Sequence, residues 1–353
     1  LTSCQSTVPS PVDPTKQINS TQPTSEAHLQ IEQTATSIAP CAFSKDVDGS
    51  FVPIVNRPSL AYDERRQKTV LYDGRNGCTW EYDGTAWELI ETETSPPSSS
   101  SEKLIYDSTQ GFIRLVGDFS NWSEVWQYNG TDWQRIVAEN SFFPFSSGWI
   151  TAAYMPDKQV IYVLGACLQK CSGEGYYSGW LFDGKSWVEE RIIPFGADAA
   201  AGEPTYMTPE VVYFEDKQNL VLQTGFGGAS VGSWALSYDG NEWKISEDST
   251  STSGINDLSL FFDMVYDSDR KVVVLFGAFL EGEKLISETW EYDGLEWKQV
   301  FPQISPSVRG WHAMAYNSHQ KVVVMYGGSD YFYNNSVDYY ETWEYDGVTW
   351  MQK

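Results

Sequence analysis

The chain has 353 residues, which is long for an ordinary domain but normal for a single closed repeat domain. Its formal net charge of −25 at pH 7 repels phosphate, which argues against nucleic-acid binding and against charge-driven docking on an anionic membrane. No stretch reaches the ~18 consecutive apolar residues expected of a membrane-spanning helix.

The first four residues, Leu1-Thr2-Ser3-Cys4, resemble the lipobox of bacterial lipoproteins, in which a signal peptide is cut before a cysteine that then carries lipid. Residues 5–40 are rich in Ser, Thr, Pro and Gln, so they bury too little apolar surface to offset their ordering entropy. We therefore expect residues 1–40 to be a lipobox remnant and a disordered linker. The resemblance implies an exported protein, anchored on an extracytoplasmic bacterial surface only by acyl chains on Cys4. A stray cysteine in a disordered tail is the alternative.

Four further cysteines, an even number, fit an oxidising compartment. Cys167 and Cys171 lie in one short segment, so a local disulfide between them leaves Cys41 to pair with Cys78. A zinc site at Cys167 and Cys171 is the rival interpretation, but no second ligand pair is evident among only three histidines. The sequence therefore predicts two disulfides, no metal and no cofactor.

The phrase TWEYDG occurs at 79–84, 289–294 and 342–347, and looser copies occur at 125–133, 179–187 and 236–243. Asp-Gly and Asn-Gly are strong hairpin signals, because their residues tolerate the positive φ of tight turns. A two-residue turn at Asp83-Gly84 places Trp80 opposite Trp87, and the same count applies to the other copies. In the fourth copy this count pairs Leu236 with Trp243 and leaves Trp234 two residues out of register, which predicts a bulge or an altered strand there.

A second landmark recurs, an aromatic residue followed eleven positions later by a glycine or, in the first copy, by an aspartate. The six aromatic residues are Tyr62, Tyr106, Tyr154, Phe214, Tyr266 and Tyr316. A period near ~50 residues is typical of a four-stranded propeller blade. The last copy shows the four expected strands most clearly, at 310–316, 321–328, 341–347 and 348–353.

These features resemble the kelch repeat family over roughly residues 50–353. The resemblance rests on Ala315-Tyr316, on Gly327-Gly328 and on Trp343-Glu344-Tyr345, although the diglycine is in register only in the sixth repeat. It implies an all-β fold, a six-bladed kelch-type β-propeller with four antiparallel strands per blade. We expect it to occupy residues 41–353, with blades at about 50–92, 101–138, 148–192, 207–247, 259–301 and 309–353.

Each blade then comes from one contiguous repeat, so no strand exchange locks the ring. The Cys41–Cys78 bridge would hold the first blade, and residues 50–55 could pair across the seam between the first and last blades.

One face of such a propeller should carry long aromatic loops, because loops after each second strand emerge beside those between blades. The segments are 139–149, 171–179, 196–206, 309–312 and 329–341, and the opposite face should carry only tight turns. Aromatic side chains suit sugar or peptide ligands. The candidate ligand-binding residues are Trp149, Tyr177, Arg309, Trp311, His312, Tyr331, Tyr333 and Tyr340. The alternative for each aromatic residue is that it packs its own loop.

The sequence favours a binding or scaffold module for a glycan or protein ligand, without a catalytic residue. The alternative is a carbohydrate-active enzyme similar to the sialic acid mutarotases among kelch propellers, with Arg309 and His312 in a pocket at the channel mouth. Galactose oxidase also has a kelch-like propeller, but three histidines cannot rebuild its copper centre. No Ser-His-Asp spacing and no phosphate loop stands out.

Overall fold

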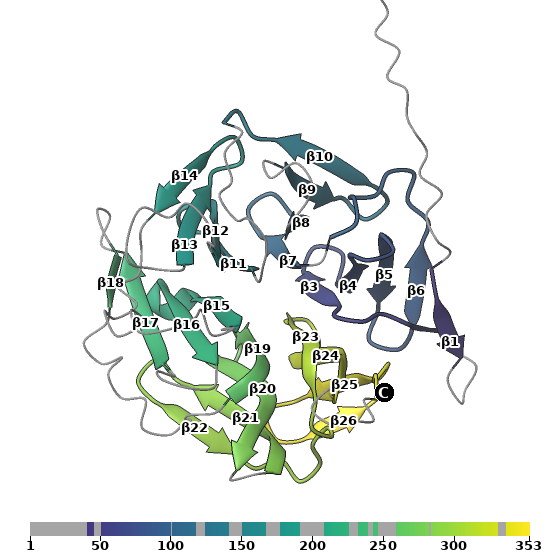
Figure 1. Cartoon of the computed structure of the whole chain (residues 1–353), viewed down its shortest axis with the longest axis vertical. Coiled ribbons are helices and arrows are strands. Elements are labelled where there is room, and N and C mark those ends of the chain that lie inside the picture. The colour runs from purple at the N-terminus through teal and green to yellow at the C-terminus, as the bar shows by residue number, and fades with distance from the viewer. Residues whose placement is uncertain are drawn as a thin grey trace, which may run out of the picture. The chain divides into compact units, whose positions relative to one another are not determined.

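The computed structural model describes residues 41–45, 51–99, 101–117, 124–140, 150–166, 177–190, 208–225, 232–238, 243–245, 259–281, 284–330 and 337–353. Within these ranges the chain forms six four-stranded antiparallel sheets and one two-stranded sheet. The six sheets surround a common centre as the blades of a β-propeller (Figure 1). The predicted fold class is therefore confirmed.

Each blade is a meander in which sequence order equals spatial order, with its first strand nearest the centre (Figure 1). Blade 1 contains β3 (Ser59–Asp63), β4 (Lys68–Asp73), β5 (Cys78–Tyr82) and β6 (Trp87–Ile90). Blade 2 contains β7 (Glu102–Asp107), β8 (Phe112–Gly117), β9 (Glu124–Tyr128) and β10 (Trp133–Val137). Blade 3 contains β11 (Ile150–Met155), β12 (Val160–Ala166), β13 (Tyr177–Phe182) and β14 (Trp187–Glu190).

The second half of the ring repeats this order. Blade 4 contains β15 (Thr208–Phe214), β16 (Asn219–Gly225), β17 (Gly232–Tyr238) and β18 (Trp243–Ile245), with the 3-10 helix η2 (Glu215–Lys217) after β15. Blade 5 contains β19 (Ser259–Asp267), β20 (Val272–Glu281), β21 (Lys284–Tyr292) and β22 (Trp297–Val300). Blade 6 contains β23 (Gly310–Asn317), β24 (Val322–Ser329), β25 (Thr342–Tyr345) and β26 (Trp350–Gln352).

The hydrophobic core lies between the blades rather than within them. Each of the six buried clusters of the described residues joins two consecutive blades, including blades 6 and 1. Both faces of each sheet are therefore covered, which is why β4 and β24 are buried along almost their whole length. The outer strands bury only their first residue, as Trp87 of β6 and Trp187 of β14 show.

The hairpin after each TWEYDG phrase is longer than the two-residue turn predicted from Asp-Gly. Tyr82 pairs with Trp87, and Trp80 with Leu89, so four residues form the turn. The Asp83 Oδ1 atom accepts hydrogen bonds from the backbone N–H groups of Thr85, at 2.8 Å, and Ala86, at 3.0 Å. An aspartate side chain that caps its own turn in this way favours the longer loop. The predicted Trp–Trp pairs are therefore wrong, and each second tryptophan faces the tyrosine or phenylalanine of its phrase instead.

The fourth blade corrects two further expectations. In blade 4, Tyr213 rather than Phe214 is equivalent to Tyr62 of blade 1. Both tyrosines form the second-to-last residue pair between the first and second strands, counted toward the turn that joins these strands. The ladder between β17 and β18 is regular and pairs Tyr238 with Trp243, so the bulge predicted near Trp234 is absent from these described strands.

Several residues of TWEYDG connect neighbouring blades. The threonine of one blade accepts a hydrogen bond from the second tryptophan of the next, as Trp133 Nε1 donates to Thr79 Oγ1 at 2.8 Å. The glutamate accepts from the next blade's tyrosine, as Tyr128 Oη donates to Glu81 Oε1 at 2.9 Å. The turn glycine lies at positive φ, and at Gly130 an added Cβ would approach Arg66 of blade 1 to 2.7 Å.

The same contacts close the seam between blade 6 and blade 1. Trp87 Nε1 donates to Thr342 Oγ1 at 2.8 Å, and Tyr82 Oη donates to Glu344 Oε1 at 3.2 Å. The seam therefore uses the pattern found between other blades, with no exchanged strand among the described residues.

The N-terminal part of the described chain adds a strap to this seam. The predicted Cys41–Cys78 disulfide is present and ties residue 41 to β5. The strand β2 (Phe51–Pro53) pairs with β1 (Phe43–Lys45) and not across the seam, which corrects the expectation for residues 50–55. The carbonyl oxygen of Pro53 nevertheless accepts a hydrogen bond from Tyr326 Oη of blade 6.

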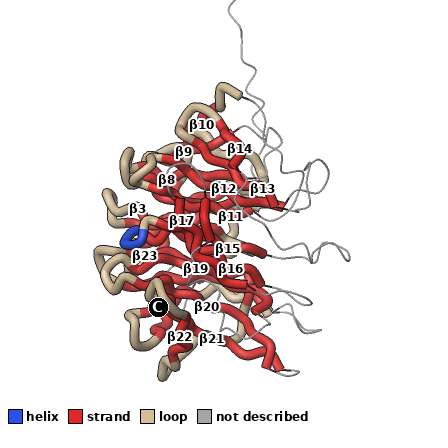
Figure 2. Tube along the Cα trace, turned by 90° about the vertical axis from the view of Figure 1, so that its left-hand side faces the viewer, coloured by secondary structure: helices blue, strands red, loops and turns tan. Residues whose placement is uncertain are grey.

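The side view in Figure 2 shows short turns and η2 along one edge of the ring of sheets. The short turns are the four-residue turns that join consecutive strands within a blade. They lie on the face where the sequence predicts only tight turns. The segments between consecutive blades, and those joining the second strand of each blade to the third, begin and end at the opposite face, where the inner strands start.

A candidate ligand site at one end of the central channel

The first strand of every blade contributes residues to the central channel at matching register positions. In each blade we take the residue that stands three positions before the aromatic residue of the inner strand. In blades 1 to 6 these residues are Ser59, Lys103, Thr151, Glu210, Asp263 and Ala313. We call these six residues the ring level. The position five residues earlier carries Arg57, Ser101, Phe261 and Trp311 in blades 1, 2, 5 and 6, and we call these four residues the mouth level.

Three ring-level side chains join neighbouring inner strands. Ser59 Oγ accepts a hydrogen bond from the backbone N–H of Leu104 at 2.7 Å. Thr151 Oγ1 accepts one from Val211 at 3.1 Å. Asp263 Oδ2 accepts one from Met314 at 2.7 Å. Each acceptor belongs to the blade before its donor, so these contacts fix the spacing of the inner strands where the channel opens.

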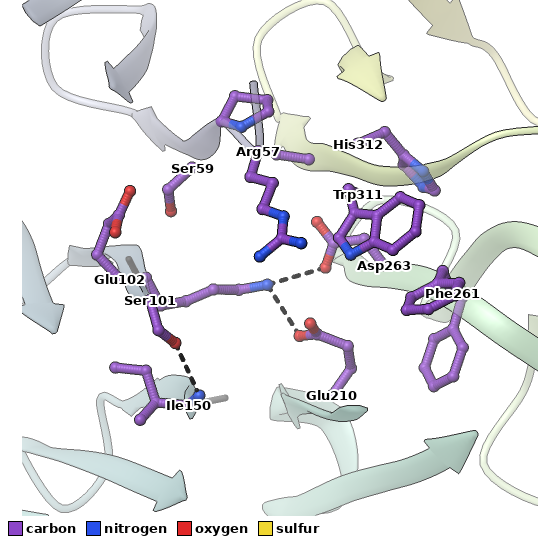
Figure 3. Close-up of a pocket in the computed structure, with 14 residues that line it drawn as sticks. Arg57, Ser59, Ser101, Glu102, Ile150, Glu210, Phe261, Asp263, Trp311 and His312 are labelled. Atoms are coloured by element: carbon purple, nitrogen blue, oxygen red, sulfur yellow. Dashed lines mark hydrogen bonds and ion pairs between the residues drawn. The ribbon is translucent and has the colours of Figure 1, made fainter. Parts of the chain in front are cut away.

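Lys103 reaches across the channel from blade 2 to the acids of blades 4 and 5. Its Nζ atom lies 2.8 Å from Glu210 Oε2 and 3.0 Å from Asp263 Oδ1 (Figure 3). The acids are held in place independently. Glu210 Oε2 accepts a hydrogen bond from Thr151 Oγ1 at 3.0 Å, and Asp263 Oδ1 accepts one from the Met264 N–H at 2.9 Å. A charged group so deep in the fold persists because it is paired and hydrogen-bonded.

The mouth level forms an aromatic wall beside this charged group. The rings of Trp311 and Phe261 lie with centroids 4.0 Å apart, and the Arg57 guanidinium carbon lies 5.5 Å from the Trp311 ring. Trp311 adopts φ 55°, a left-handed conformation that is rare for a bulky residue. Such strain persists only where the surrounding structure requires it, and it often occurs at binding sites.

Burial changes the protonation behaviour of three groups here. Desolvation raises the pKa of Glu102 to about 8, and the backbone N–H of Gly74 donates to its Oε1 atom at 3.1 Å. Desolvation likewise raises the pKa of Glu210 to about 7, although Lys103 opposes the shift. His312 lies against the Phe276 ring, and desolvation lowers its pKa to about 4, so its imidazole is neutral at pH 7.

These residues surround a half-open cavity of about 100 Å³ (Figure 3). Its lining combines the mouth level and all ring-level residues except Thr151 with Pro58, Glu102, Ile150, Phe262 and His312. Typical pockets for drug-sized ligands measure roughly 300–1,000 Å³. The cavity therefore has room for one end of a ligand, such as part of a single ring, and not for a large cofactor.

The structure places the predicted site residues in different surroundings. Trp311 and His312 line the cavity. Arg309 does not, because its side chain is 1% exposed and is held by blade 6 itself. Its Nη2 atom donates to Glu341 Oε2 at 2.9 Å, and its guanidinium carbon lies 4.0 Å from the Tyr339 ring centroid. Arg309 and His312 therefore do not share this cavity.

Tyr340 is half-buried and does not line the cavity. Tyr177 begins β13, where the structure describes the backbone only. The remaining predicted positions lie outside the described residues: Cys4, Trp149, Cys167, Cys171, Tyr331 and Tyr333.

Sequence reasoning missed Lys103, Glu210 and Asp263. Each is one charge among 71 charged residues, 23 basic and 48 acidic, so composition does not single it out. The signal that could have found them is the register, since all three stand three residues before an aromatic anchor. The anchor Phe214, wrong by one residue, concealed Glu210.

Among the described residues, no group of three or more His, Cys, Asp and Glu side chains is arranged to hold a metal ion. The same part of the chain has no helix with the length and apolar character needed to cross a bilayer.

Comparisons with known proteins identify the fold. No protein-family model matches the chain, and no curated protein matches it. Among solved structures it is similar to a mutant of the Aleuria aurantia lectin in complex with Fucα1-6GlcNAc, with a TM-score of 0.54 and 13% identity over 84% of this chain and 94% of that one.

Two further structures are similar over comparable lengths. The protein AofleA from Arthrobotrys oligospora has a TM-score of 0.55 and 9% identity, covering 85% of this chain and 86% of its own. The SapL1 lectin in complex with α-methyl fucoside has a TM-score of 0.51 and 11% identity, covering 85% and 96%. At these identities the likeness concerns the architecture, and the chain shares the β-propeller fold of these proteins.

Proposed function

We propose that this chain is a glycan-binding propeller module, exported by a bacterium and displayed on an extracytoplasmic membrane surface through acyl chains on Cys4. The observation that carries the proposal is the cavity, where the aromatic wall of Trp311 and Phe261 stands beside the charged group of Lys103, Glu210 and Asp263.

Sugars present apolar C–H faces and hydroxyl edges at once. An aromatic ring offers a large rigid surface for the first, and charged side chains form strong hydrogen bonds with the second. A mostly apolar cavity would suit a lipid or a peptide side chain, whereas this lining mixes both characters in one small space. The geometry therefore fits the end of a glycan better than a protein surface.

The fold comparisons support the same ligand class. Two of the similar propellers are described as lectins in complex with fucosylated or fucoside ligands. A propeller is compatible with many functions, so this support is an analogy and the cavity remains the main argument.

We also infer that the repeats are of the kelch type and that the chain is a lipoprotein. Ala315-Tyr316, Gly327-Gly328 and Trp343-Glu344-Tyr345 support the first inference, together with the four-stranded blades. The Cys41–Cys78 disulfide supports export, because disulfides persist in oxidising compartments. Mass spectrometry of the protein purified from its native membrane tests lipidation. An unmodified Cys4 would contradict the anchor and leave the glycan proposal standing.

A glycan array probed with the full chain tests the function directly. We expect reproducible binding that Trp311→Ala abolishes. The matched control is Val348→Ala, an exposed residue of a turn between β25 and β26 on the opposite face. If no glycan binds although the protein is folded, or if both variants bind equally well, the proposal is wrong.

A further inference from the structure

The repeats are nearly uniform where they build the ring and different where they face the cavity. The second tryptophan recurs in all six blades, as Trp87, Trp133, Trp187, Trp243, Trp297 and Trp350. The ring level instead carries six different residue types at equivalent positions, Ser59, Lys103, Thr151, Glu210, Asp263 and Ala313. A site made from ring-level residues therefore has no copy by pseudo-symmetry elsewhere in the ring.

The charged group retains hydrogen-bonding capacity on both of its sides. A lysine ammonium has three donor hydrogens, and the described residues engage two of them, through Glu210 and Asp263. Among described contacts, Glu210 uses its Oε2 atom for both Lys103 and Thr151. Its Oε1 atom therefore remains an acceptor beside a donor, and about a fifth of the Lys103 side chain, 21%, is exposed.

A donor next to an acceptor matches a hydroxyl group, which accepts and donates at once. The site holds charges of both signs, because Lys103 pairs with Glu210 and Asp263 and the cation Arg57 also lines the cavity. An anionic ligand group would meet Glu210 and Asp263, and a cationic one would meet Lys103 and Arg57. Like charges at close range in a partly desolvated site repel each other strongly. The site therefore discriminates against both kinds of ion.

We propose that the cavity binds one neutral, polyhydroxylated ligand end per chain, such as a non-ionic terminal sugar, with Lys103 and Glu210 bonding to its hydroxyl groups and Trp311 stacking on its ring. This inference rests on the proposed function and deepens it. It specifies location, stoichiometry and ligand charge, none of which the function alone requires.

Isothermal titration calorimetry on the full chain tests the stoichiometry and the preferred ligand charge. The probes are methyl glycosides of L-fucose, D-galactose and D-mannose as neutral sugars, glucuronic acid as an anion and glucosamine as a cation. We expect at least one neutral probe to bind with a stoichiometry of one, and at least tenfold more tightly than either charged probe. Stronger binding of a charged probe, or several sites per chain, would overturn the inference.

Two variants locate the site. Glu210→Gln keeps the shape of the side chain and removes its charge, and we expect a roughly tenfold or greater loss of affinity. Lys103→Met should abolish binding, but it leaves Glu210 and Asp263 unpaired and could unfold the protein. Glu210→Gln therefore keeps the inference falsifiable on its own. The matched control is Lys321→Met, since Lys321 forms an exposed ion pair with Asp269 on the turn face.

The outcomes separate the inference from the function beneath it. If the glycan array detects no binding, both the proposed function and this inference are wrong. If the array detects glycan binding but Glu210→Gln binds with unchanged affinity, only this inference is wrong. The glycan site then lies away from the channel. Loss of affinity in Glu210→Gln, with Lys321→Met unchanged and a stoichiometry of one, supports it.

Discussion

The seam between blades 6 and 1 offers a sharp test of how the repeated phrase stabilises the ring. Thr342 Oγ1 accepts a hydrogen bond from Trp87 Nε1 at 2.8 Å, and the two residues are only 5% and 6% exposed. Thr342→Val removes the acceptor with little change in shape and leaves a buried indole N–H without a partner. Such a loss costs about 1–3 kcal/mol of unfolding free energy.

A double-mutant cycle isolates the hydrogen bond from the packing. Phenylalanine has no N–H group, so in a Trp87→Phe background Thr342→Val should cost less than about 0.5 kcal/mol. Urea denaturation followed by circular dichroism measures all four proteins. Equal losses in both backgrounds would falsify the assignment of the stabilisation to this hydrogen bond.

Two equivalent bonds serve as internal comparisons. Trp133 Nε1 donates to Thr79 at 2.8 Å, and Trp350 Nε1 donates to Thr289 at 3.1 Å. Thr79→Val and Thr289→Val should fall in the same range as Thr342→Val, because all three sites share their burial and geometry. A much larger effect at Thr342 alone would show that the seam depends on this bond more than the other interfaces do.

Three further predictions concern the strap, one buried acid and one turn. Replacing Cys41 and Cys78 by serine should cost about 4 kcal/mol by the loop-entropy estimate for a separation of 37 residues, measured as a lower melting temperature. The folded pKa of Glu102 is raised from 4.5 to about 8, so its stabilising contribution is complete below about pH 4.5 and is lost as the pH rises to about 8. Glu102→Gln should therefore remove this part of the decline in the urea midpoint, and an unchanged pH profile would contradict it. Gly130→Ala and Gly184→Ala share a positive φ, but only the first meets a neighbour, so Gly130→Ala should lower the melting temperature more.

The repeat pattern was sufficient to predict the fold, because the same constraint appears six times. Glycine slots, aromatic anchors and TWEYDG together determine strand number and blade order, and errors at one copy do not change the result. The Cys41–Cys78 pairing followed from counting four cysteines. The turn length was wrong because Asp-Gly has two interpretations, and the side chain of Asp83, which caps a four-residue turn, decides between them.

The site was harder to predict because its residues are not repeated and come from distant blades. Lys103 and Glu210 are 107 residues apart in sequence, and only closure of the ring brings them to 2.8 Å. Arg309 was chosen because it stands before an inner strand, but local partners at Ser307 and Glu341 hold its side chain inside blade 6. A local sequence signal cannot report such cross-ring pairing, whereas register relative to the aromatic anchors can.

The hydrogen bonds between neighbouring blades affect how the chain assembles. In an open chain of six blades, Thr342 and Glu344 at one end and Tyr82 and Trp87 at the other would all lack the partners that they have in the ring. No earlier step forms these two hydrogen bonds, because each joins the blades at opposite ends of the sequence. Closure therefore gains these hydrogen bonds in a single event, which makes the last step of assembly strongly favourable.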